Sequence, residues 1–125
     1  MGSKDIHFKL YKKFKNDAEN LDNFEGTRVE AYFLSEYHLI ESCVAIERVH
    51  INKHQYVRSI LTQNTFIFQE DTKTIWTNFQ KIENQLRPKF SYGFTWNDED
   101  MKTVEKCYSI LEMLCLKKME VSSNE

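Results

Sequence analysis

Glycine and proline are scarce in this chain, whose 125 residues include three glycines and one proline. Both residue types interrupt regular structure, so their scarcity favours long, uninterrupted elements. The β-branched residues are scattered and do not alternate with polar residues, which argues against half-buried strands. Together these absences predict an all-α fold, and the apolar stripes along the chain fit a four- to five-helix bundle.

Cysteine and excess charge are also in short supply. The cysteines are too few and too far apart for a disulfide framework, and we expect them to be small buried residues of a reducing compartment: Cys43, Cys107 and Cys115. The formal net charge is -2, so the chain as a whole is not drawn to nucleic acid or to an anionic membrane. A local basic patch is still compatible with this balance.

Long hydrophobic runs are absent as well. No apolar run approaches the ~18 residues that a membrane-spanning helix needs. The opening residues MGSKD are not a charged stretch followed by an apolar one, so no signal peptide is expected. We therefore predict a cytoplasmic protein without a membrane partner. A hydrophobic content of 41% is sufficient for one folded domain over residues 1–125, with its core at about 5–118.

Apolar spacing and helix-stop residues divide the chain into predicted helices. We expect them at about 4–21, from Thr27, at His54–Gln63, from Asp71 to about Arg87, and after Asn97. The expected buried stripe of the first helix is Ile6, Leu10, Phe14, Ala18 and Leu21. The expected N-terminal caps are Thr27 in a capping box with Glu30, then Asn52, Asp71 and Asn97.

The stretch RPKFSYGFTW, residues 87–96, holds the one proline together with two basic residues and four aromatic ones. Its ordinary interpretation is a helix stop and turn, because Pro88 cannot donate to the helical ladder and Gly93 permits a bend. The aromatic residues would then plug the end of the bundle: Phe90, Phe94 and Trp96. The same stretch could also present Arg87 as part of a binding site.

Other residues offer weaker chemistry. His50 and His54 have the spacing of two imidazoles on one helix face, but no HExxH pattern accompanies them, and no metal site is predicted. Arg48 precedes His54 at a spacing that would suit acid–base work on a phosphodiester. The lysines of the first helix would either meet phosphates or form a solvated face: Lys9, Lys12, Lys13 and Lys15. Because no phosphate-binding loop or other cofactor motif occurs, no cofactor is expected.

The order of several short motifs resembles the HEPN family, the higher eukaryote and prokaryote nucleotide-binding domains. Ala31-Tyr32-Phe33 followed by Tyr37-His38 matches the second helix of that family, and His54 matches the histidine that opens the third. Arg87 followed by Tyr92-Gly93 matches the end of the fourth. The resemblance covers about residues 28–116 and is nearest to small prokaryotic proteins found beside minimal nucleotidyltransferases.

The resemblance implies an antiparallel bundle that forms a homodimer, in a toxin–antitoxin or defence type of system. Active members of the family are metal-independent ribonucleases that use an arginine and, four to six residues later, a histidine. Here Tyr92 stands where that histidine is expected. Tyrosine, with an unperturbed pKa near 10, is a poor general base at neutral pH. The motif is thus degenerate, and the resemblance implies a non-catalytic module that binds RNA, a nucleotide or a partner nucleotidyltransferase.

The resemblance also implies site residues. Arg87, Lys89 and Tyr92 are the expected binding residues. A ribonuclease or toxin, the alternative, would draw its catalytic residues from Arg87, Tyr92, His54 and His38. A purely structural dimerisation module is the third hypothesis, and the expected dimer face is either the apolar loop Phe66-Ile67-Phe68 or the first helix.

Overall fold

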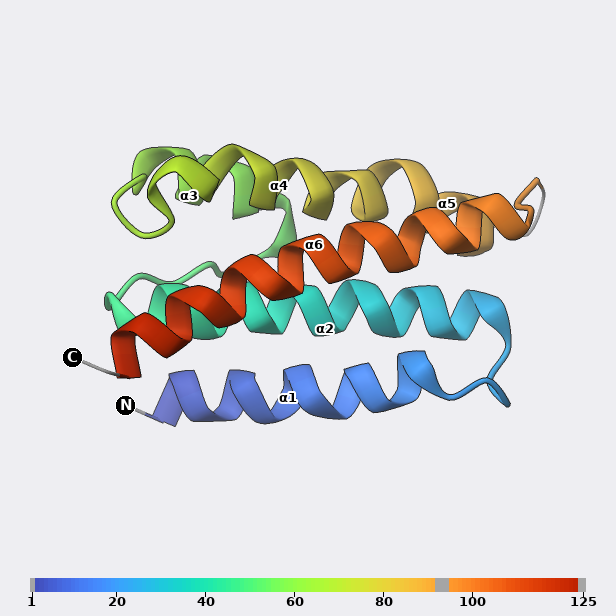
Figure 1. The fold of residues 1–125 in the computed structure, drawn as a ribbon, viewed down its shortest axis with the longest axis horizontal. Helices are drawn as coiled ribbons and strands as arrows, with labels where there is room; N and C mark the ends of the chain where they lie inside the picture. The colour runs from blue at the N-terminus through green and yellow to red at the C-terminus, as the bar shows by residue number, and fades with distance from the viewer. Residues whose placement is uncertain (1, 92–94, 124–125) are drawn as a thin grey trace.

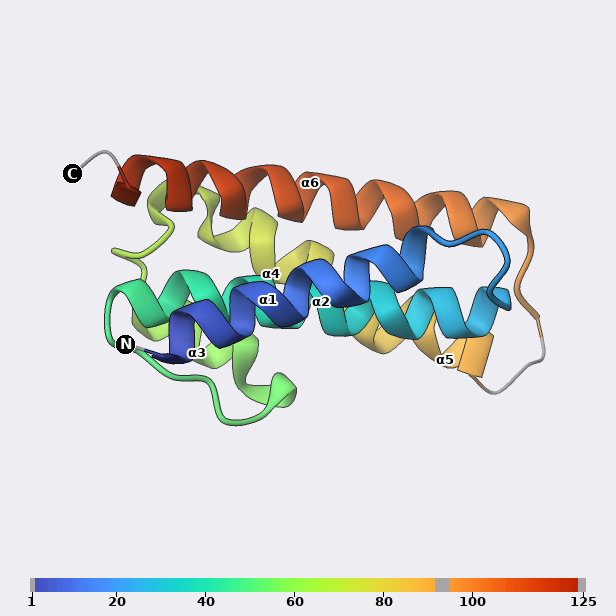
Figure 2. The same cartoon turned by 90° about the horizontal axis from the view of Figure 1, so that it is seen from below.

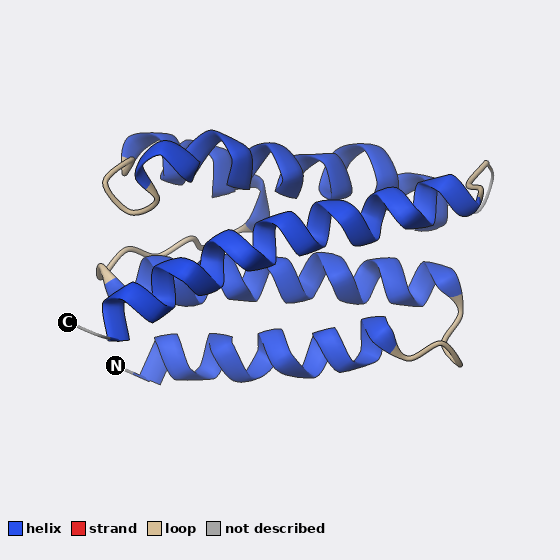
Figure 3. Cartoon of the chain, in the orientation of Figure 1, coloured by secondary structure: helices blue, strands red, loops and turns tan. Residues whose placement is uncertain are grey.

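The structure is a computed structural model that describes residues 2–91 and 95–123. Over these residues every regular element is helical and none is a strand, which confirms the predicted all-α class (Figure 3). In chain order the elements are α1 (Gly2–Glu19), α2 (Glu25–Ile46), η1 (His54–Tyr56), α3 (Val57–Gln63), η2 (Gln69–Asp71), α4 (Thr72–Gln80), the π-helix η3 (Lys81–Leu86), α5 (Arg87–Ser91) and α6 (Asp98–Ser123).

The elements form a layered bundle in which α4, η3 and α5 make one continuous helical rod. With that rod counted once, five helices pack together (Figure 1). α1 and α2 run antiparallel, and α6 lies against both α2 and the rod. The short helix α3 packs on α4. α1 begins and α6 ends at the same end of the bundle (Figures 1 and 2).

The hydrophobic core lies around α2, which packs against α1, α4, α5 and α6. Its apolar sequence predicts this central position. The largest fully buried side chains include Phe33, Leu39 and Ile40 of α2, Phe79 and Ile82 of the rod, and Leu111 of α6. Burial of apolar area stabilises a fold by about 25 cal/mol per Å². α2 is therefore the scaffold from which side chains reach both α1 and the rod.

α1 turns a different face to the bundle from the one that its apolar residues predict. Ile6 and Leu21 are 58% and 80% exposed, so the predicted stripe is wrong at these positions. Tyr11 is buried instead, and its hydroxyl donates to Glu112 of α6 at 2.5 Å. Lys15 pairs with the same carboxylate at 2.8 Å. Polar groups that find partners on α6 thus occupy part of the inner face of α1.

The predicted cap of α6 is confirmed. Asn97 Oδ1 accepts a hydrogen bond from the backbone N–H of Asp100 at 2.9 Å, and Asp100 Oδ2 accepts one from the N–H of Asn97 at 3.0 Å. This reciprocal pair satisfies two backbone donors at the start of the helix. Asp71 does occupy the N-cap of α4, but its side chain makes no capping bond. Its carboxylate pairs with Lys117 of α6 at 3.3 Å.

The other two predicted caps are wrong. α2 begins at Glu25, before Thr27, and its N-cap residue makes no side-chain capping bond. The cap of η1 is Lys53 rather than Asn52. A tertiary contact fixes the start of α2, because Arg28 Nε donates to the carbonyl of Ala18 at 2.7 Å and so ties α2 to the end of α1.

Pro88 does not end the fourth helix, contrary to the prediction. The rod continues through η3 into α5, and the N–H of Arg87 donates to the carbonyl of Ile82, five residues earlier. A proline inside an α-helix clashes with the carbonyl four residues before it, here that of Asn84. The wider turn of a π-helix relieves such a clash. The helix therefore passes Pro88 and ends at Ser91.

The aromatic residues beyond Pro88 are only partly described. Phe90 is buried, and its ring stacks on that of Trp96 with the centroids 4.8 Å apart. Gly93 and Phe94, for which a bend and a plug were predicted, lie outside the described residues. In the segment before η2, Phe68 is buried but Phe66 is 57% exposed.

All three cysteines are free and buried, as predicted. Within residues 2–91 and 95–123, no helix combines the length and the apolar character that a membrane crossing requires.

Candidate functional site

Arg87, the first residue of α5, lies over the ring of Phe33 of α2. Its guanidinium carbon is 4.0 Å from the ring centroid. One guanidinium nitrogen is 3.6 Å from a carboxylate oxygen of Glu30, which precedes Phe33 by about one helical turn. The Arg87 side chain is 25% exposed. Because a guanidinium has five N–H donors, Arg87 can still bind a further acceptor.

His54, the first residue of η1, approaches the same Phe33 ring from another direction. The imidazole and phenyl centroids are 5.0 Å apart, with their planes nearly perpendicular at 86°. His54 Nδ1 is 2.5 Å from Oε2 of Glu83. Arg87 and His54 are therefore brought together at one ring, on the side of α2 that faces the rod.

Glu83 belongs to the π-helix η3 and is buried. It precedes Arg87 by four residues, and residues at that spacing lie on the same side of a helix. One stretch of the rod thus supplies both the carboxylate that holds His54 and the guanidinium beside it. The hydrogen bond assigns a proton to His54 Nδ1 and leaves Nε2 as the nitrogen without a partner among the described residues. π-Helical turns frequently occur at functional sites.

Glu36 lies one turn beyond Phe33 on α2 and is fully buried, with 0% exposure. Neither of its carboxyl oxygens has a hydrogen-bond partner among the described residues. Burial raises the pKa of Glu36 well above its ordinary value, and Cys107 and Glu83 raise it further, while Arg87 opposes the shift. Because an isolated buried carboxylate is costly, this environment favours the neutral form of Glu36.

Of the other predicted binding residues, Lys89 is directed elsewhere and Tyr92 lies outside the described residues. Lys89 Nζ pairs with Oδ1 of Asp100 at 3.2 Å, so it is tied to the first turn of α6. Arg87 is the one predicted binding residue that the described structure places beside a histidine.

His38, a predicted catalytic candidate, lies on the α1 side of α2. Its Nδ1 is 2.9 Å from Nδ1 of His7, and its ring stacks on Phe14 with the centroids 5.7 Å apart. Burial lowers the pKa of His38 to about 4, and His7 contributes to the same shift. His7 Nε2 is also 3.1 Å from Oε2 of Glu41. The structure therefore places His38 in a separate polar cluster rather than beside Arg87.

The weaker sequence candidates also fall outside the Phe33 site. Arg48 lies two residues after the end of α2 with a left-handed backbone, φ 61°, and His54 takes Glu83 rather than Arg48 as its partner. On α1, Lys12 lies over the ring of Phe8 with its nitrogen 4.8 Å from the centroid. Within the described part of the chain, no group of three or more His, Cys, Asp and Glu side chains is placed to hold a metal ion.

Sequence reasoning missed the two carboxyl groups of the site. The available signal for Glu83 was its place in the predicted helix next to Ile82, a residue of the buried stripe. The signal for Glu36 was an acidic residue in the middle of the most apolar helix. Neither signal reveals the partner, because His54 and Glu83 are 29 positions apart in the sequence and meet only in the folded chain.

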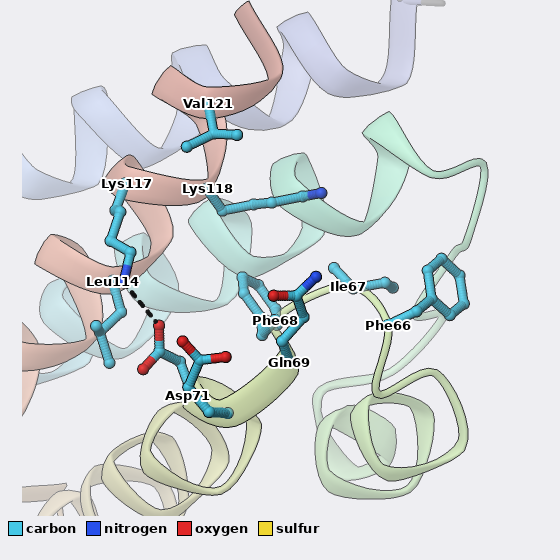
Figure 4. Close-up of a pocket in the computed structure, with 10 residues that line it drawn as sticks. Phe66, Ile67, Phe68, Gln69, Asp71, Leu114, Lys117, Lys118 and Val121 are labelled. Atoms are coloured by element: carbon cyan, nitrogen blue, oxygen red, sulfur yellow. Dashed lines mark hydrogen bonds and ion pairs between the residues drawn. The ribbon is translucent and has the colours of Figure 1, made fainter. Parts of the chain in front are cut away.

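A separate hollow of about 190 Å³ lies between η2, the loop before it and the end of α6 (Figure 4). Phe66 and Val121 stand exposed at its rim, and the ion pair of Lys117 with Asp71 crosses it. It lies at the end of the bundle opposite to α5 (Figure 1) and is distinct from the Phe33 site.

The function has to be inferred from these side chains. No match to this chain is found among protein-family models, curated proteins or solved structures.

Proposed function

We propose that this chain is a non-catalytic module of HEPN type that binds a phosphate of RNA or of a nucleotide between Arg87 and His54. The observation that carries the proposal is that both side chains contact the one ring of Phe33. A guanidinium donates two parallel hydrogen bonds to a phosphate, and an imidazole can add a third contact. The helical bundle and the order of the sequence motifs also support the proposal.

The charges around Arg87 permit such a ligand. The ion pair with Glu30 is a single contact at 3.6 Å, and the Glu30 side chain is 43% exposed. Exposed pairs of this kind are worth about 0–1 kcal/mol. A phosphate that accepts two charge-assisted hydrogen bonds can therefore replace Glu30 as the main partner of Arg87.

The test is a titration of the purified protein with labelled RNA at fixed salt, following both binding and cleavage. Arg87→Ala should weaken binding about tenfold or more, because a charged hydrogen-bonding fork is lost. Arg87→Lys, which keeps the charge but not the fork, should be intermediate. Lys89→Ala is the matched control, since it removes a nearby cation that is already tied to Asp100, and it should change binding less than about twofold.

Two results would contradict the proposal. The first is equal binding of RNA by the wild type and by Arg87→Ala, with the same helical content measured by circular dichroism. In that case the third hypothesis, a structural or dimerisation module, would remain. Cleavage that depends on Arg87 would instead favour the second candidate, a metal-independent ribonuclease.

The second candidate is favoured by one observation, the contact of His54 with Glu83. A carboxylate on one imidazole nitrogen orients the ring and fixes the tautomer of a general base. His54 Nε2 would take the proton of a 2′-hydroxyl as its oxygen attacks phosphorus, and Arg87 would stabilise the charge on the phosphate. The bond from phosphorus to the 5′-oxygen would break, and that oxygen would leave with a proton from water and yield a 2′,3′-cyclic phosphate. Glu83→Gln should then lower the cleavage rate about 100-fold with little loss of binding. A wild type that cleaves no RNA in a metal chelator would rule this candidate out.

We also propose a second copy of the chain and a minimal nucleotidyltransferase as protein partners, in a toxin–antitoxin or defence type of system. The motif order supports both partners, and exposed apolar side chains such as Phe66 supply surface for them.

A further inference from the structure

Arg58 and Trp76 form another cation–aromatic pair, between α3 and the rod. The guanidinium carbon of Arg58, in α3, is 4.2 Å from the centroid of a Trp76 ring in α4. Arg58 is exposed and Trp76 is half-buried. Arg58 makes no ion pair or hydrogen bond within the described residues, in contrast to Arg87 and Arg28, which both have carboxylate partners.

The two pairs are connected through one segment of the chain. His54 in η1 and Arg58 in α3 are four residues apart, and both reach the rod, where they contact Glu83 and Trp76. Trp76 and Glu83 therefore face the same segment, and Arg87 follows Glu83 along the rod by four residues. Three basic side chains thus follow the rod, each of them beside an aromatic ring: Arg58, His54 and Arg87.

The length of this row distinguishes an oligonucleotide from a single nucleotide as the ligand. The rod is continuous from α4 to α5, and eleven residues at the α-helical rise of 1.5 Å give at most about 16 Å between Trp76 and Arg87, since the turns of η3 are wider and shorter. One strand of a stacked nucleic acid carries a phosphate about every 3.4 Å, so this length corresponds to at most about five stacked nucleotides and to fewer in an extended strand. A single nucleotide cannot reach both ends of the row.

We propose that the ligand is a single-stranded oligonucleotide that follows this row, with one base stacked on the Arg58 guanidinium. The inference rests on the proposed function, because Arg87 and His54 bind one of its phosphates. An exposed guanidinium that lies on an indole presents its other face as a stacking platform, and single-stranded bases stack on arginine and aromatic planes. A duplex keeps its bases paired and does not offer them to such a platform.

The experiment compares ligand lengths at fixed salt, with AMP and with labelled single-stranded RNAs of two and eight nucleotides. Arg58→Ala should weaken binding of the eight-nucleotide RNA about fivefold or more and leave AMP binding unchanged. Arg87→Ala should weaken the binding of both. Lys12→Ala is the matched control, since it removes another cation from an aromatic ring, on a helix that packs on α2 and not on the rod. It should change neither.

Fluorescence gives an independent readout, because the chain has two tryptophans. In a Trp96→Phe variant Trp76 is the remaining tryptophan, and the eight-nucleotide RNA should quench its emission while AMP should not. The same quenching by single-stranded DNA would mean that the row binds single strands without reading the 2′-hydroxyl, which also supports the proposal.

The possible failures are distinguishable. Loss of binding in Arg87→Ala, but binding of the eight-nucleotide RNA by Arg58→Ala as tight as by the wild type, would overturn the row and leave the proposed phosphate site standing. Tighter binding of a duplex than of the single strand would also overturn the row. A wild type that binds neither AMP nor RNA would overturn both proposals.

Discussion

Glu36 is the residue whose environment conflicts most with its chemistry. Its carboxyl group is fully buried, has no hydrogen-bond partner among the described residues, and has its pKa raised by that burial. A group whose folded-state pKa is raised gives its full contribution to stability below the unfolded pKa, near 4.5. That contribution is lost as the pH rises through the folded-state value.

Replacing this acid should stabilise the protein at neutral pH and above. We expect Glu36→Met to raise the free energy of unfolding by about 1–3 kcal/mol at pH 8, because an unpaired buried polar group is replaced by an apolar one of similar length. The gain should shrink toward pH 5. Denaturant unfolding at pH 5, 6.5 and 8 measures it. Glu36→Gln is the control, since it removes the ionisation and retains the polar group. A loss of stability for Glu36→Met at every pH would mean that the carboxyl group has a partner.

His38 has the opposite kind of pH dependence. Its pKa is lowered to about 4 by burial and by His7, so the neutral ring contributes stability above the unfolded pKa of about 6.5. That contribution is lost as the pH falls from 6.5 toward 4. Neighbouring Glu41 acts in the other sense, because burial raises its pKa to about 7 and its contribution is lost as the pH rises from 4.5.

The His38 contribution can be isolated with a variant that does not titrate. Between pH 6.5 and pH 4 the free energy of unfolding of His38→Gln should fall by about 1–2 kcal/mol less than that of the wild type. Partial exposure of the ring keeps this difference small. Unfolding curves at these pH values, together with the NMR titration of the His38 ring, measure the difference. Parallel stability curves for the two proteins would contradict the assignment.

At the scale of elements, the end of α2 is strained. Arg48 has a left-handed backbone with φ 61°, and its N–H donates to the carbonyl of Ala45 while the N–H of Val49 donates to that of Val44. This is the arrangement in which helices commonly place glycine. The left-handed conformation costs an L-residue with a side chain about 1–2 kcal/mol.

We therefore expect Arg48→Gly to raise the free energy of unfolding by about 0.5–1 kcal/mol, the strain released less the extra freedom of glycine in the unfolded chain. Arg48→Ala retains the strain and loses the same charge, so it should leave stability nearly unchanged. Thermal and denaturant unfolding of the three proteins compare them. A destabilised glycine variant would show that the Arg48 side chain has a role that its described contacts do not reveal.

The elements also differ in how far the sequence predicts them. Asn97 is predicted correctly because its partner Asp100 lies three residues away and no tertiary contact displaces the helix start. The same spacing fails at Thr27 and Glu30, where the contact of Arg28 with Ala18 fixes an earlier start. Pro88 is predicted incorrectly because the rule for proline assumes an α-helical turn, whereas η3 widens the turn before it. The stripe of α1 is misplaced because its direction depends on partners in α6, such as Glu112, that no local pattern identifies.

At the scale of the whole molecule, the site also combines residues that the sequence predicts with contacts that only the fold reveals. Arg87 and His54 are both found from the order of motifs, whereas their meeting at Phe33 depends on the packing of α2 against the rod and on the contact of His54 with Glu83. Glu83 is missed for that reason. A residue type can be read from a sequence, but a partner more than twenty positions away requires the fold.

Exposed apolar side chains gather at two places that suit a second copy of the chain. One is the hollow with Phe66 and Val121 at its rim, and the other is α1 and the turn after it, with Ile6 and Leu21. We expect the hollow to be the interface, because two neighbouring apolar elements, α6 and the loop before η2, face solvent there.

Phe66→Ser combined with Val121→Ser should convert a dimer into a monomer at micromolar concentration, as measured by light scattering after size exclusion. Ile6→Ser combined with Leu21→Ser is the matched pair and should leave the mass unchanged. Dissociation of the second pair instead would assign the interface to α1, and a wild-type monomer would remove the dimer altogether.

The attachment of α3 has a consequence for its hydrogen exchange. This helix has seven residues, too few to be stable alone, and it is attached to the rod through Arg58 within it and His54 in η1 before it. Its amide protons should therefore exchange with solvent through local opening rather than through global unfolding. A strand bound across Arg58, His54 and Arg87 would favour the closed segment, so hydrogen exchange in α3 should slow when the strand binds.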